Sequence, residues 1–273
     1  MSNPEIAKNI KTGNFNTNYH DLGEGETVMF IHGSGPGVSA YANWRLCMPY
    51  VAENFRVIAP DMVGFGYTDR PEGMVYNMDI WIKQVIDLMD ALNIEKTNLV
   101  GNSFGGGLAI SLAIKHPNRF NKIVLMGSMG IEFELTAGLD QAWGYTPSIE
   151  NMKSLLDTFA HSRLLVTDEL AKLRYDASIR PGFQESFSSM FPFPRQSSVT
   201  SMASNEEDIK TIKNDVLIIH GREDKVIPFE NSIRLHKLIT KSQLHAFGEC
   251  GHWSQIEHGG RFNTLIRDFF MEK

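Results

Sequence analysis

The sequence predicts an α/β fold: a mostly parallel sheet flanked by helices, with a helical segment inserted into it. Three observations predict this class. Short apolar runs bounded by turn residues recur along the chain, and their lack of polar alternation indicates strands buried on both faces. Segments with helical periodicity lie between these runs. One long stretch, residues 131–208, contains helical patterns but no convincing strand.

Six apolar runs predict the strands, and two periodic segments predict helices between them. Ile82, Val85 and Met89 recur at helical spacing and form one apolar stripe. A second helix is expected over residues 104–116, since Pro117 ends it. The predicted strands are residues 28–31, 57–58, 99–100, 123–126, 216–219 and 244–247.

The inserted stretch divides the chain into two predicted domains. Residues 145–160 and 167–179 are helical by period, whereas Pro and Ser interrupt residues 181–195. We interpret the insertion as a cap, with extra helices packed on the sheet edge as the alternative. The predicted domains are an α/β core of residues 1–130 and 209–273 and a helical cap of residues 131–208.

Composition excludes several classes of protein. The chain has 26 basic and 32 acidic residues, a formal charge of −6, and no basic block, unlike a nucleic-acid binder. No apolar run approaches the length of a membrane span, and the first residues show no secretory pattern. Two cysteines, Cys47 and Cys250, fit a reducing compartment. We therefore expect a cytoplasmic protein that binds neither nucleic acid nor membrane.

The strongest chemical signal is Gly101-Asn102-Ser103-Phe104-Gly105, a G-x-S-x-G motif between a predicted strand and a predicted helix. A serine nucleophile needs such a tight strand-to-helix turn, and glycines on both sides let the two segments approach. The start of the helix also offers the Phe104 amide to a developing oxyanion. Ser103 is therefore the predicted nucleophile; glycines placed for packing alone are the alternative.

A serine nucleophile requires a base and an acid that orients the base, here in the chain order Ser, Asp, His. Asp224 and His252 each follow a predicted strand, at the sheet edge where α/β proteins build their sites. Glu223 competes with Asp224, and a solvated loop charge is the alternative for either. We favour Asp224 because the next residues turn the chain back toward the core. Most of the nine histidines are expected to serve packing or the surface.

The loop at residues 32–37, His-Gly-Ser-Gly-Pro-Gly, follows a buried strand. Its glycines let backbone amides point into a site, and Ser34 is the predicted second oxyanion donor beside Phe104. The glycine spacing matches neither a phosphate loop nor a dinucleotide fingerprint. No segment has metal-ligand spacing, so we expect neither metal nor cofactor. Asp61 in Asp-Met-Val-Gly-Phe-Gly is expected to be structural.

These motifs together resemble the α/β-hydrolase superfamily: HGSGPG at 32–37, DMVGFG at 61–66, GNSFGGG at 101–107, GRED at 221–224 and GHW at 251–253. More narrowly, the chain resembles the meta-cleavage product hydrolases of bacterial aromatic degradation, on the 2-hydroxymuconic semialdehyde branch. The resemblance extends through the cap. It implies the α/β-hydrolase fold with an eight-stranded sheet, no cofactor, and a homodimer or larger homo-oligomer.

The resemblance also implies a reaction. Such enzymes hydrolyse a carbon–carbon bond in 2-hydroxy-6-oxo-hexa-2,4-dienoate-type compounds, giving 2-hydroxypenta-2,4-dienoate and a carboxylic acid. The dienol first becomes its keto form, and then Ser103, or a water controlled by His252, attacks the carbonyl beside the bond. Asp224 holds the imidazole, and the Ser34 and Phe104 amides bind the oxyanion.

By the same resemblance, Arg174 reaches from the cap to the carboxylate of this anionic dienoate, while Asn102 and Trp253 orient the same end. From the residues alone, Arg174 is a solvated helix charge, Asn102 a turn residue and Trp253 a packing residue. The opposite, apolar end of the pocket is expected to include Met129, Val199 and Ile227.

Two other classes use the same fold. An esterase or lactonase could use the same triad on another acyl group, without needing Arg174 or Asn102. A non-catalytic small-molecule receptor is the second alternative, which an intact set of Ser103, Asp224 and His252 disfavours. Dehalogenases and epoxide hydrolases carry Asp at the nucleophile position, where this chain has Ser103.

Overall fold

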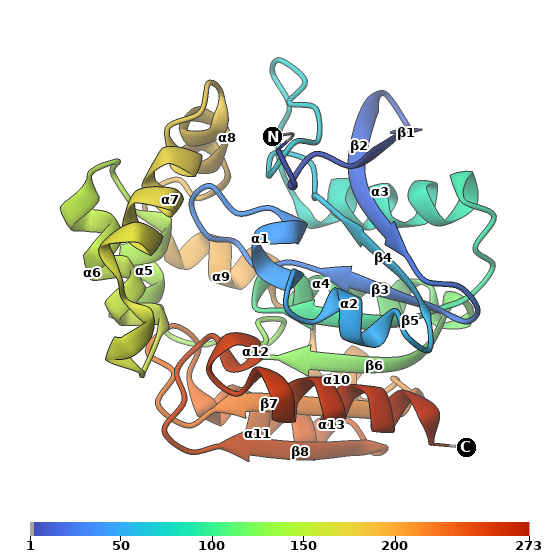
Figure 1. Cartoon of the computed structure of the whole chain (residues 1–273). Coiled ribbons are helices and arrows are strands. Elements are labelled where there is room, and N and C mark those ends of the chain that lie inside the picture. The colour runs from blue at the N-terminus through green and yellow to red at the C-terminus, as the bar shows by residue number, and fades with distance from the viewer. Residues whose placement is uncertain (1–2, 273) are drawn as a thin grey trace.

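The computed structural model describes residues 3–272 and contains one eight-stranded sheet (Figure 1). Its strand order is β1-β2-β4-β3-β5-β6-β7-β8. Both pairings of β2 are antiparallel, and every other neighbouring pair is parallel. The strands are β1 (Lys8–Thr12), β2 (Phe15–Leu22), β3 (Thr27–Ile31), β4 (Arg56–Pro60), β5 (Thr97–Asn102), β6 (Phe120–Met126), β7 (Val216–Gly221) and β8 (Ser242–Phe247).

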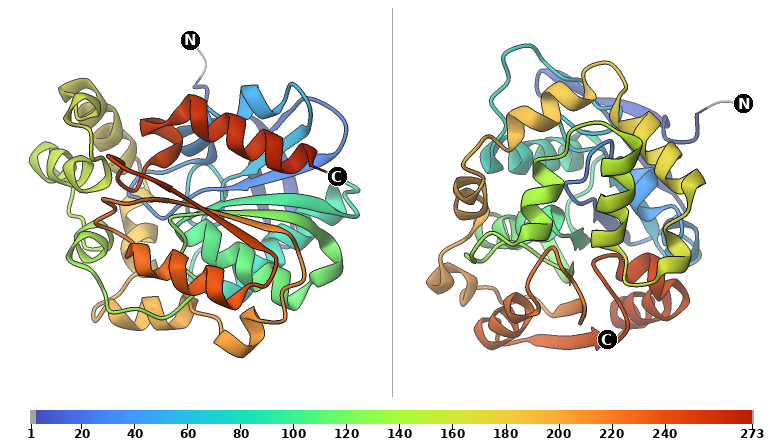
Figure 2. Two further views of the ribbon diagram at one scale, coloured as in Figure 1. Left: turned by 90° about the horizontal axis from the view of Figure 1, so that it is seen from below. Right: turned by 90° about the vertical axis from the view of Figure 1, so that its left-hand side faces the viewer.

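Helices cover both faces of the sheet, and Figure 2 (left) shows them as two layers. Strand residues alternate between the two cores: Met29 and Ile31 join the core under α3, α4 and α11, whereas Val28 and Phe30 join the core under α1, α2 and α13. This is why the strands read as continuous apolar runs. These helices are α1 (Ala40–Trp44), α2 (Met48–Val51), α3 (Met78–Ala91), α4 (Phe104–Lys115), α11 (Phe229–Leu238), α12 (Ser254–Glu257) and α13 (Gly259–Met271), with the 3-10 turn η1 (Pro117–Arg119).

Between β6 and β7 the chain forms helices only, and α5 to α9 gather at one end of the sheet (Figure 1; Figure 2, right). They lie over the edge where the parallel strands end, and we refer to them as the cap helices. The segment contains α5 (Ala137–Trp143), α6 (Ile149–Phe159), the 3-10 turn η2 (Arg163–Leu165), α7 (Asp168–Ser178), α8 (Phe183–Met190), α9 (Gln196–Met202) and α10 (Glu206–Ile209).

The predicted fold class is confirmed, and all six predicted strands are present. The sequence analysis missed β1 and β2, because these strands at one edge of the sheet alternate with polar residues and contain no apolar run. In the cap it anticipated α6 and α7 but missed α5, α8 and α9. The segment interrupted by Pro and Ser contains α8, whose buried Phe183, Phe187 and Met190 lie at helical spacing.

Candidate active site

Ser103 lies on a strained turn between β5 and α4. Its φ of 55° and ψ of −113° are outside the regions that side chains favour, and its amide is held by Met126 O at 2.9 Å. The turn needs its glycines: a Cβ on Gly101 would lie 2.3 Å from the carbonyl oxygen of Gly105, and one on Gly105 would lie 2.3 Å from that of Ile31. The predicted nucleophile thus occupies an elbow that only this sequence pattern permits.

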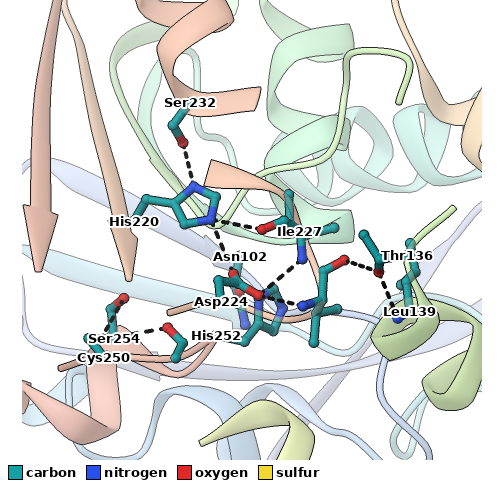
Figure 3. Close-up of polar contacts among 12 residues, drawn as sticks. Asn102, Thr136, Leu139, His220, Asp224, Ile227, Ser232, Cys250, His252 and Ser254 are labelled. Carbon is teal, nitrogen blue, oxygen red and sulfur yellow. Dashed lines mark hydrogen bonds and ion pairs between the residues drawn. The ribbon is translucent and has the colours of Figure 1, made fainter. Parts of the chain in front are cut away.

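Asp224 and His252 form a buried pair (Figure 3). Asp224 Oδ2 lies 2.7 Å from His252 Nδ1, and the two side chains are 0 % and 5 % exposed. The other carboxylate oxygen, Oδ1, accepts from the amides of Val226 at 2.7 Å and Ile227 at 3.0 Å. Burial alone would raise the pKa of Asp224, but the His252 charge and hydrogen bonds from His220 and His252 outweigh it, so this pKa lies well below its ordinary value. The carboxylate is therefore ionised and held toward His252.

Glu223, the competing carboxylate, points elsewhere. Its oxygens bind Arg222 Nε at 2.8 Å and the Cys250 amide at 3.0 Å. The hydrogen bond from Cys250 and the Arg222 charge lower the pKa of Glu223. This carboxylate therefore braces the loop that carries His252 and does not contact the imidazole.

One cavity of about 270 Å³ contains Ser103 and His252 in its lining. Its volume is at the lower end of small-molecule sites. No hydrogen bond joins the Ser103 hydroxyl to His252 within residues 3–272, and such bonds are often long before substrate binds. The His252 amide donates to Phe159 O of the cap at 2.7 Å, so the base is tied to the helices that cover it.

The two predicted oxyanion donors, the amides of Ser34 and Phe104, lie on segments that one side chain joins. Asn43 Oδ1 accepts from the Gly33 amide at 2.8 Å and from Asn102 Nδ2 at 3.1 Å. Gly33 precedes Ser34, and Asn102 is two residues before Phe104. Asn43 therefore sets the spacing between the loop that contains Ser34 and the turn that contains Phe104. The sequence analysis missed it; its only signal is a polar residue in an otherwise apolar helix.

A cap helix also holds the loops of the site. The Thr136 hydroxyl, which caps the start of α5, donates to Val226 O at 2.8 Å. At the other end of α5, Trp143 Nε1 donates to Ser34 Oγ at 3.0 Å. Helix α5 thus connects the loop of Asp224 with the loop of Ser34, and it approaches closely because a Cβ on Gly138 would lie 2.2 Å from Lys225 O.

His32 fixes the start of the Ser34 loop. Its Nδ1 donates to Gly33 O at 2.7 Å and its Nε2 accepts from the Met62 amide at 3.0 Å, which requires the neutral ring. Burial lowers the pKa of His32 to about 4. Asp61, expected to be structural, accepts at Oδ1 from the Ala40 amide at 2.6 Å. It thereby ties the start of α1 to the loop after β4.

The walls of the cavity differ in polarity. The core contributes Ser34 from a loop, Asn43 from α1 and Asn102 from the end of β5, and Arg45 and Gln255 lie on the same lining. Buried Asn102 Oδ1 and Gln255 Oε1 have no hydrogen-bond partner within the described part of the chain. The facing helices α5 and α6 are apolar in the cavity and contribute Leu139, Ala142, Met152, Leu155, Leu156 and Phe159.

Arg174 of α7 lines the same cavity, as the sequence analysis expects. Its Nη2 donates to Pro36 O at 3.2 Å, and no carboxylate among residues 3–272 pairs with it. Desolvation of the guanidinium lowers the pKa of Arg174. Trp253 also lines the cavity and packs on Phe159 with ring centroids 5.2 Å apart. The cavity therefore brings a cation that forms no salt bridge among residues 3–272 together with the predicted nucleophile.

Met129, Val199 and Ile227, expected at the apolar end, are buried but do not line this cavity. Met129 lies behind the nucleophile, with its amide 3.1 Å from Ser103 O, and Val226 lines the cavity in place of its neighbour Ile227. The sequence does not fix which of two successive loop residues faces inward.

Within the described residues, no group of three or more His, Cys, Asp or Glu side chains is arranged to hold a metal ion. None of the helices in that part of the chain is long and apolar enough to cross a membrane.

Comparison with known proteins agrees with this geometry. Residues 26–259 match the α/β hydrolase fold family. A 2-hydroxymuconate semialdehyde hydrolase of Pseudomonas sp. (strain CF600) is 55 % identical, over 100 % of this chain and 96 % of its own. A 2-hydroxy-6-oxo-2,4-heptadienoate hydrolase of Pseudomonas putida is 54 % identical, over 98 % and 97 %. The S103A mutant of the meta-cleavage product hydrolase CumD from Pseudomonas fluorescens IP01, complexed with acetates, superposes with a TM-score of 0.97 at 61 % identity, over 98 % of both chains.

The fold and these matches define an α/β hydrolase. Within that family the chain belongs to the meta-cleavage product hydrolases, as the sequence motifs predict.

Proposed function

We propose that this enzyme hydrolyses the carbon–carbon bond of a 2-hydroxy-6-oxo-hexa-2,4-dienoate-type ring-fission product. 2-Hydroxymuconic semialdehyde and its alkyl-substituted analogues are the proposed substrates in aromatic hydrocarbon catabolism. The observation that carries the proposal is the shared cavity, in which the strained Ser103 and the His252–Asp224 pair face the same space as Arg174.

Arg174 binds the substrate carboxylate. A desolvated guanidinium with no acidic partner in the described chain favours an anion, although the whole protein carries a net charge of −6. Asn102, whose Oδ1 is buried without a partner, and Trp253 orient the adjacent enol oxygen and the diene. Recognition of the anion is therefore local to the cavity.

The chemical step follows from the placement of the three polar side chains. After the dienol becomes the keto form, His252 removes the proton of the Ser103 hydroxyl, or of a water, as that oxygen adds to the C6 carbonyl. Asp224 holds Nδ1 of the imidazole and stabilises its positive charge. The Ser34 and Phe104 amides bind the oxyanion, each contributing about 3–4 kcal/mol.

Collapse of the tetrahedral adduct breaks the C5–C6 bond. The electron pair passes into the dienolate fragment, which takes the proton from His252 and leaves as 2-hydroxypenta-2,4-dienoate. If water is the nucleophile, the C6 fragment leaves directly as a carboxylic acid. If Ser103 is the nucleophile, the C6 fragment remains as an ester of Ser103, and His252 then activates a water that hydrolyses this ester, releasing the carboxylic acid and returning the proton to Ser103. One water is consumed in either case. No cofactor takes part in this scheme.

The proposed cap, residues 131–208, sets the size of the accepted substrate. Its helices α5 and α6 supply the apolar lining against which the group on C6 packs. A cavity of about 270 Å³ suits a small distal substituent. The proposed core comprises residues 1–130 and 209–273.

We further propose that the enzyme is cytoplasmic and forms a homodimer or larger homo-oligomer. Its two cysteines, Cys47 and Cys250, are free and buried, which suits a reducing compartment. The proposed oligomer follows from the family. A single peak at the mass of the 30.7 kDa chain in light scattering would disprove it.

The test of the proposed function is a turnover panel of yellow ring-fission products that differ only in the group on C6. Loss of visible absorbance with a formyl or methyl ketone substrate is expected. Rapid cleavage of neutral aryl esters without bleaching would instead indicate an esterase or lactonase. Binding of the dienoate without turnover of either would indicate a receptor.

A further inference from the structure

A second histidine contacts the carboxylate of Asp224. His220, at the end of β7, is fully buried, and its Nε2 lies 3.2 Å from Asp224 Oδ2 and 3.1 Å from Ile227 O. Its Nδ1 lies 2.6 Å from the hydroxyl of Ser232 on α11. Figure 3 shows Asp224 between the two imidazoles, with His220 on the side away from His252. The sequence analysis assigned no function to His220.

The surroundings of His220 determine which nitrogen carries the proton. Ile227 O can only accept a hydrogen bond, so Nε2 must be protonated to donate to it, and this protonated nitrogen lies 3.2 Å from the ionised Asp224 carboxylate. Ser232 can donate its hydroxyl proton to Nδ1, which completes the bonding of the neutral ring. His220 is therefore held with a protonated Nε2 facing Asp224 Oδ2.

This donor is not needed to place the carboxylate. The amides of Val226 and Ile227 already fix Asp224 through Oδ1. His220 instead contacts Oδ2, the oxygen that binds His252. A donor on that oxygen withdraws negative charge from the contact with His252 and weakens its attraction for a proton on the imidazole.

We propose that His220 is a positioning residue that, by holding its protonated Nε2 against Asp224 Oδ2, weakens the attraction of this carboxylate for a proton on His252, so that His252 can act as the base. This proposal rests on the proposed function, in which His252 is the base. The two histidines share one carboxylate, so the geometry couples the strand end of β7 to the loop after β8.

Other titratable groups near the pair are few. The Cys250 thiol on the His252 loop is neutral, since burial raises its pKa to about 12. Glu223 and Glu257 are engaged by the amides of Cys250 and Gly251. The cap faces His252 with the apolar Phe159, and α11 packs Phe229 against His220 with ring centroids 5.5 Å apart. His220 is thus the neighbouring group with direct control over the Asp224–His252 pair.

The test compares pH profiles of kcat/KM for His220→Phe, His220→Met and His220→Gln with the wild type. The Phe and Met variants lack the donor, so His252 should keep its proton to higher pH, and the midpoint of the acid limb should rise by roughly one pH unit. KM should change by less than about two-fold, because His220 does not line the cavity. The Gln amide can donate in place of Nε2 and should restore most of the wild-type midpoint.

Ser232→Ala is the matched control. It removes the other hydrogen bond of the same buried imidazole but leaves Nε2 protonated, so the midpoint should stay within roughly 0.2 pH units of the wild type. Thermal unfolding of each variant identifies those that fold. Two variants without the donor, Phe and Met, are made so that the test stands if one of them does not fold. An unchanged midpoint in a folded donor-lacking variant, or an equal shift in Ser232→Ala, would overturn the proposal.

Failure of the proposed function gives a different result. If the wild type does not cleave ring-fission products but hydrolyses aryl esters, the same profiles are measured with the ester, because the Asp224–His252 pair serves either acyl transfer. A shift of the midpoint with the ester would then support the role of His220 while rejecting the proposed substrate.

Discussion

The two walls of the cavity are built in different ways. The core wall consists largely of loops at the ends of β3, β5, β7 and β8, and hydrogen bonds fix several of its polar groups. Asp224 accepts three hydrogen bonds and lies 3.2 Å from His220 Nε2, and Asn43 joins two segments through one oxygen. The cap wall is a helical surface of Leu, Met and Phe with one charged side chain, Arg174. In the proposed function, the core wall supplies the preorganised chemistry, whereas the cap wall selects the size of the substrate and binds its charge at Arg174.

The largest effect is expected from a substitution that removes the proposed nucleophile of the core wall and leaves the cap wall unchanged. Ser103→Ala should lose at least roughly 10³-fold in kcat and still bind substrate, because the nucleophile acts mainly in the transition state. Single-turnover absorbance and a binding titration measure both quantities. Ser128→Ala, a buried serine on the next loop whose hydroxyl bonds Met129 O at 2.6 Å, is the control and should keep most of its activity. Full activity of Ser103→Ala would reject the nucleophile.

The second prediction removes the one charge of the cap wall. Arg174→Ala should lower kcat/KM for the carboxylated substrate by roughly 10²-fold, since a desolvated charge pair with the substrate is lost. Hydrolysis of a neutral aryl ester should survive. Arg180→Ala is the matched control, because Arg180 follows the same helix but pairs with Glu5 at 3.4 Å and does not line the cavity. Equal losses on both substrates would contradict the assigned role of Arg174.

The third prediction concerns the pH sensitivity of the core wall. The pKa of His32 falls from 6.5 to about 4 on folding, so the unfolded chain binds the extra proton first. The contribution of neutral His32 to the free energy of unfolding is fully present above pH 6.5 and is lost as the pH falls toward 4. The loss is up to about 1.4 kcal/mol per pH unit and about 3 kcal/mol in all. Urea unfolding at pH 7, 6, 5 and 4 measures the free energy. His32→Gln should show a shallower dependence; an identical slope would show that another group is responsible.

The smallest effect is expected from a substitution that breaks the hydrogen bond between the two walls. Trp143→Phe removes the donor to Ser34 Oγ but keeps an aromatic ring against Phe191, on which the indole stacks with centroids 4.4 Å apart. We expect kcat to fall by roughly 3- to 10-fold with little change in KM, because the oxyanion loop is less well held. Steady-state kinetics measure this.

Trp81→Phe is its control, since Trp81 is also buried and donates to Val63 O at 3.0 Å but does not line the cavity; its ring packs on Phe104 with centroids 4.7 Å apart, so this variant reports a loss of packing behind the turn. If both tryptophan variants lose the same activity, the loss reflects packing, and the link through α5 has no special role in the reaction.

The core wall was more predictable from sequence than the cap wall. Ser103 and Asp224 follow the buried strands β5 and β7, and His252 follows the edge strand β8. Parallel strands all end at the same edge of the sheet, so the sequence predicts that these residues meet there. Arg174 and the lining of α5 and α6 depend on how cap helices pack over that edge, which periodicity does not specify. Consequently Arg174 was placed by family resemblance, and the distal residues Met129, Val199 and Ile227 were expected at a cavity that they do not line.

The strands β1 and β2 and the helix α8 show the same limit in the fold. Their apolar residues are few or mixed with Ser and Asn, so local patterns are weak and tertiary contacts decide the conformation. Contacts such as Asn43 to both Gly33 and Asn102 join residues far apart in the chain, and no spacing rule predicts them.

The amino-acid sequence by itself determined the α/β class, the order of nucleophile, acid and base, and the glycines that the turn at Ser103 requires, because each depends on local sterics and on the period of buried residues. The sequence favours Asp224 over Glu223, and the contact of Asp224 with His252 agrees with that choice. Tertiary structure alone decided that His220 contacts the same carboxylate and that α5 ties the loop of Asp224 to the loop of Ser34. These contacts depend on distances between separate segments, which only the packed chain defines.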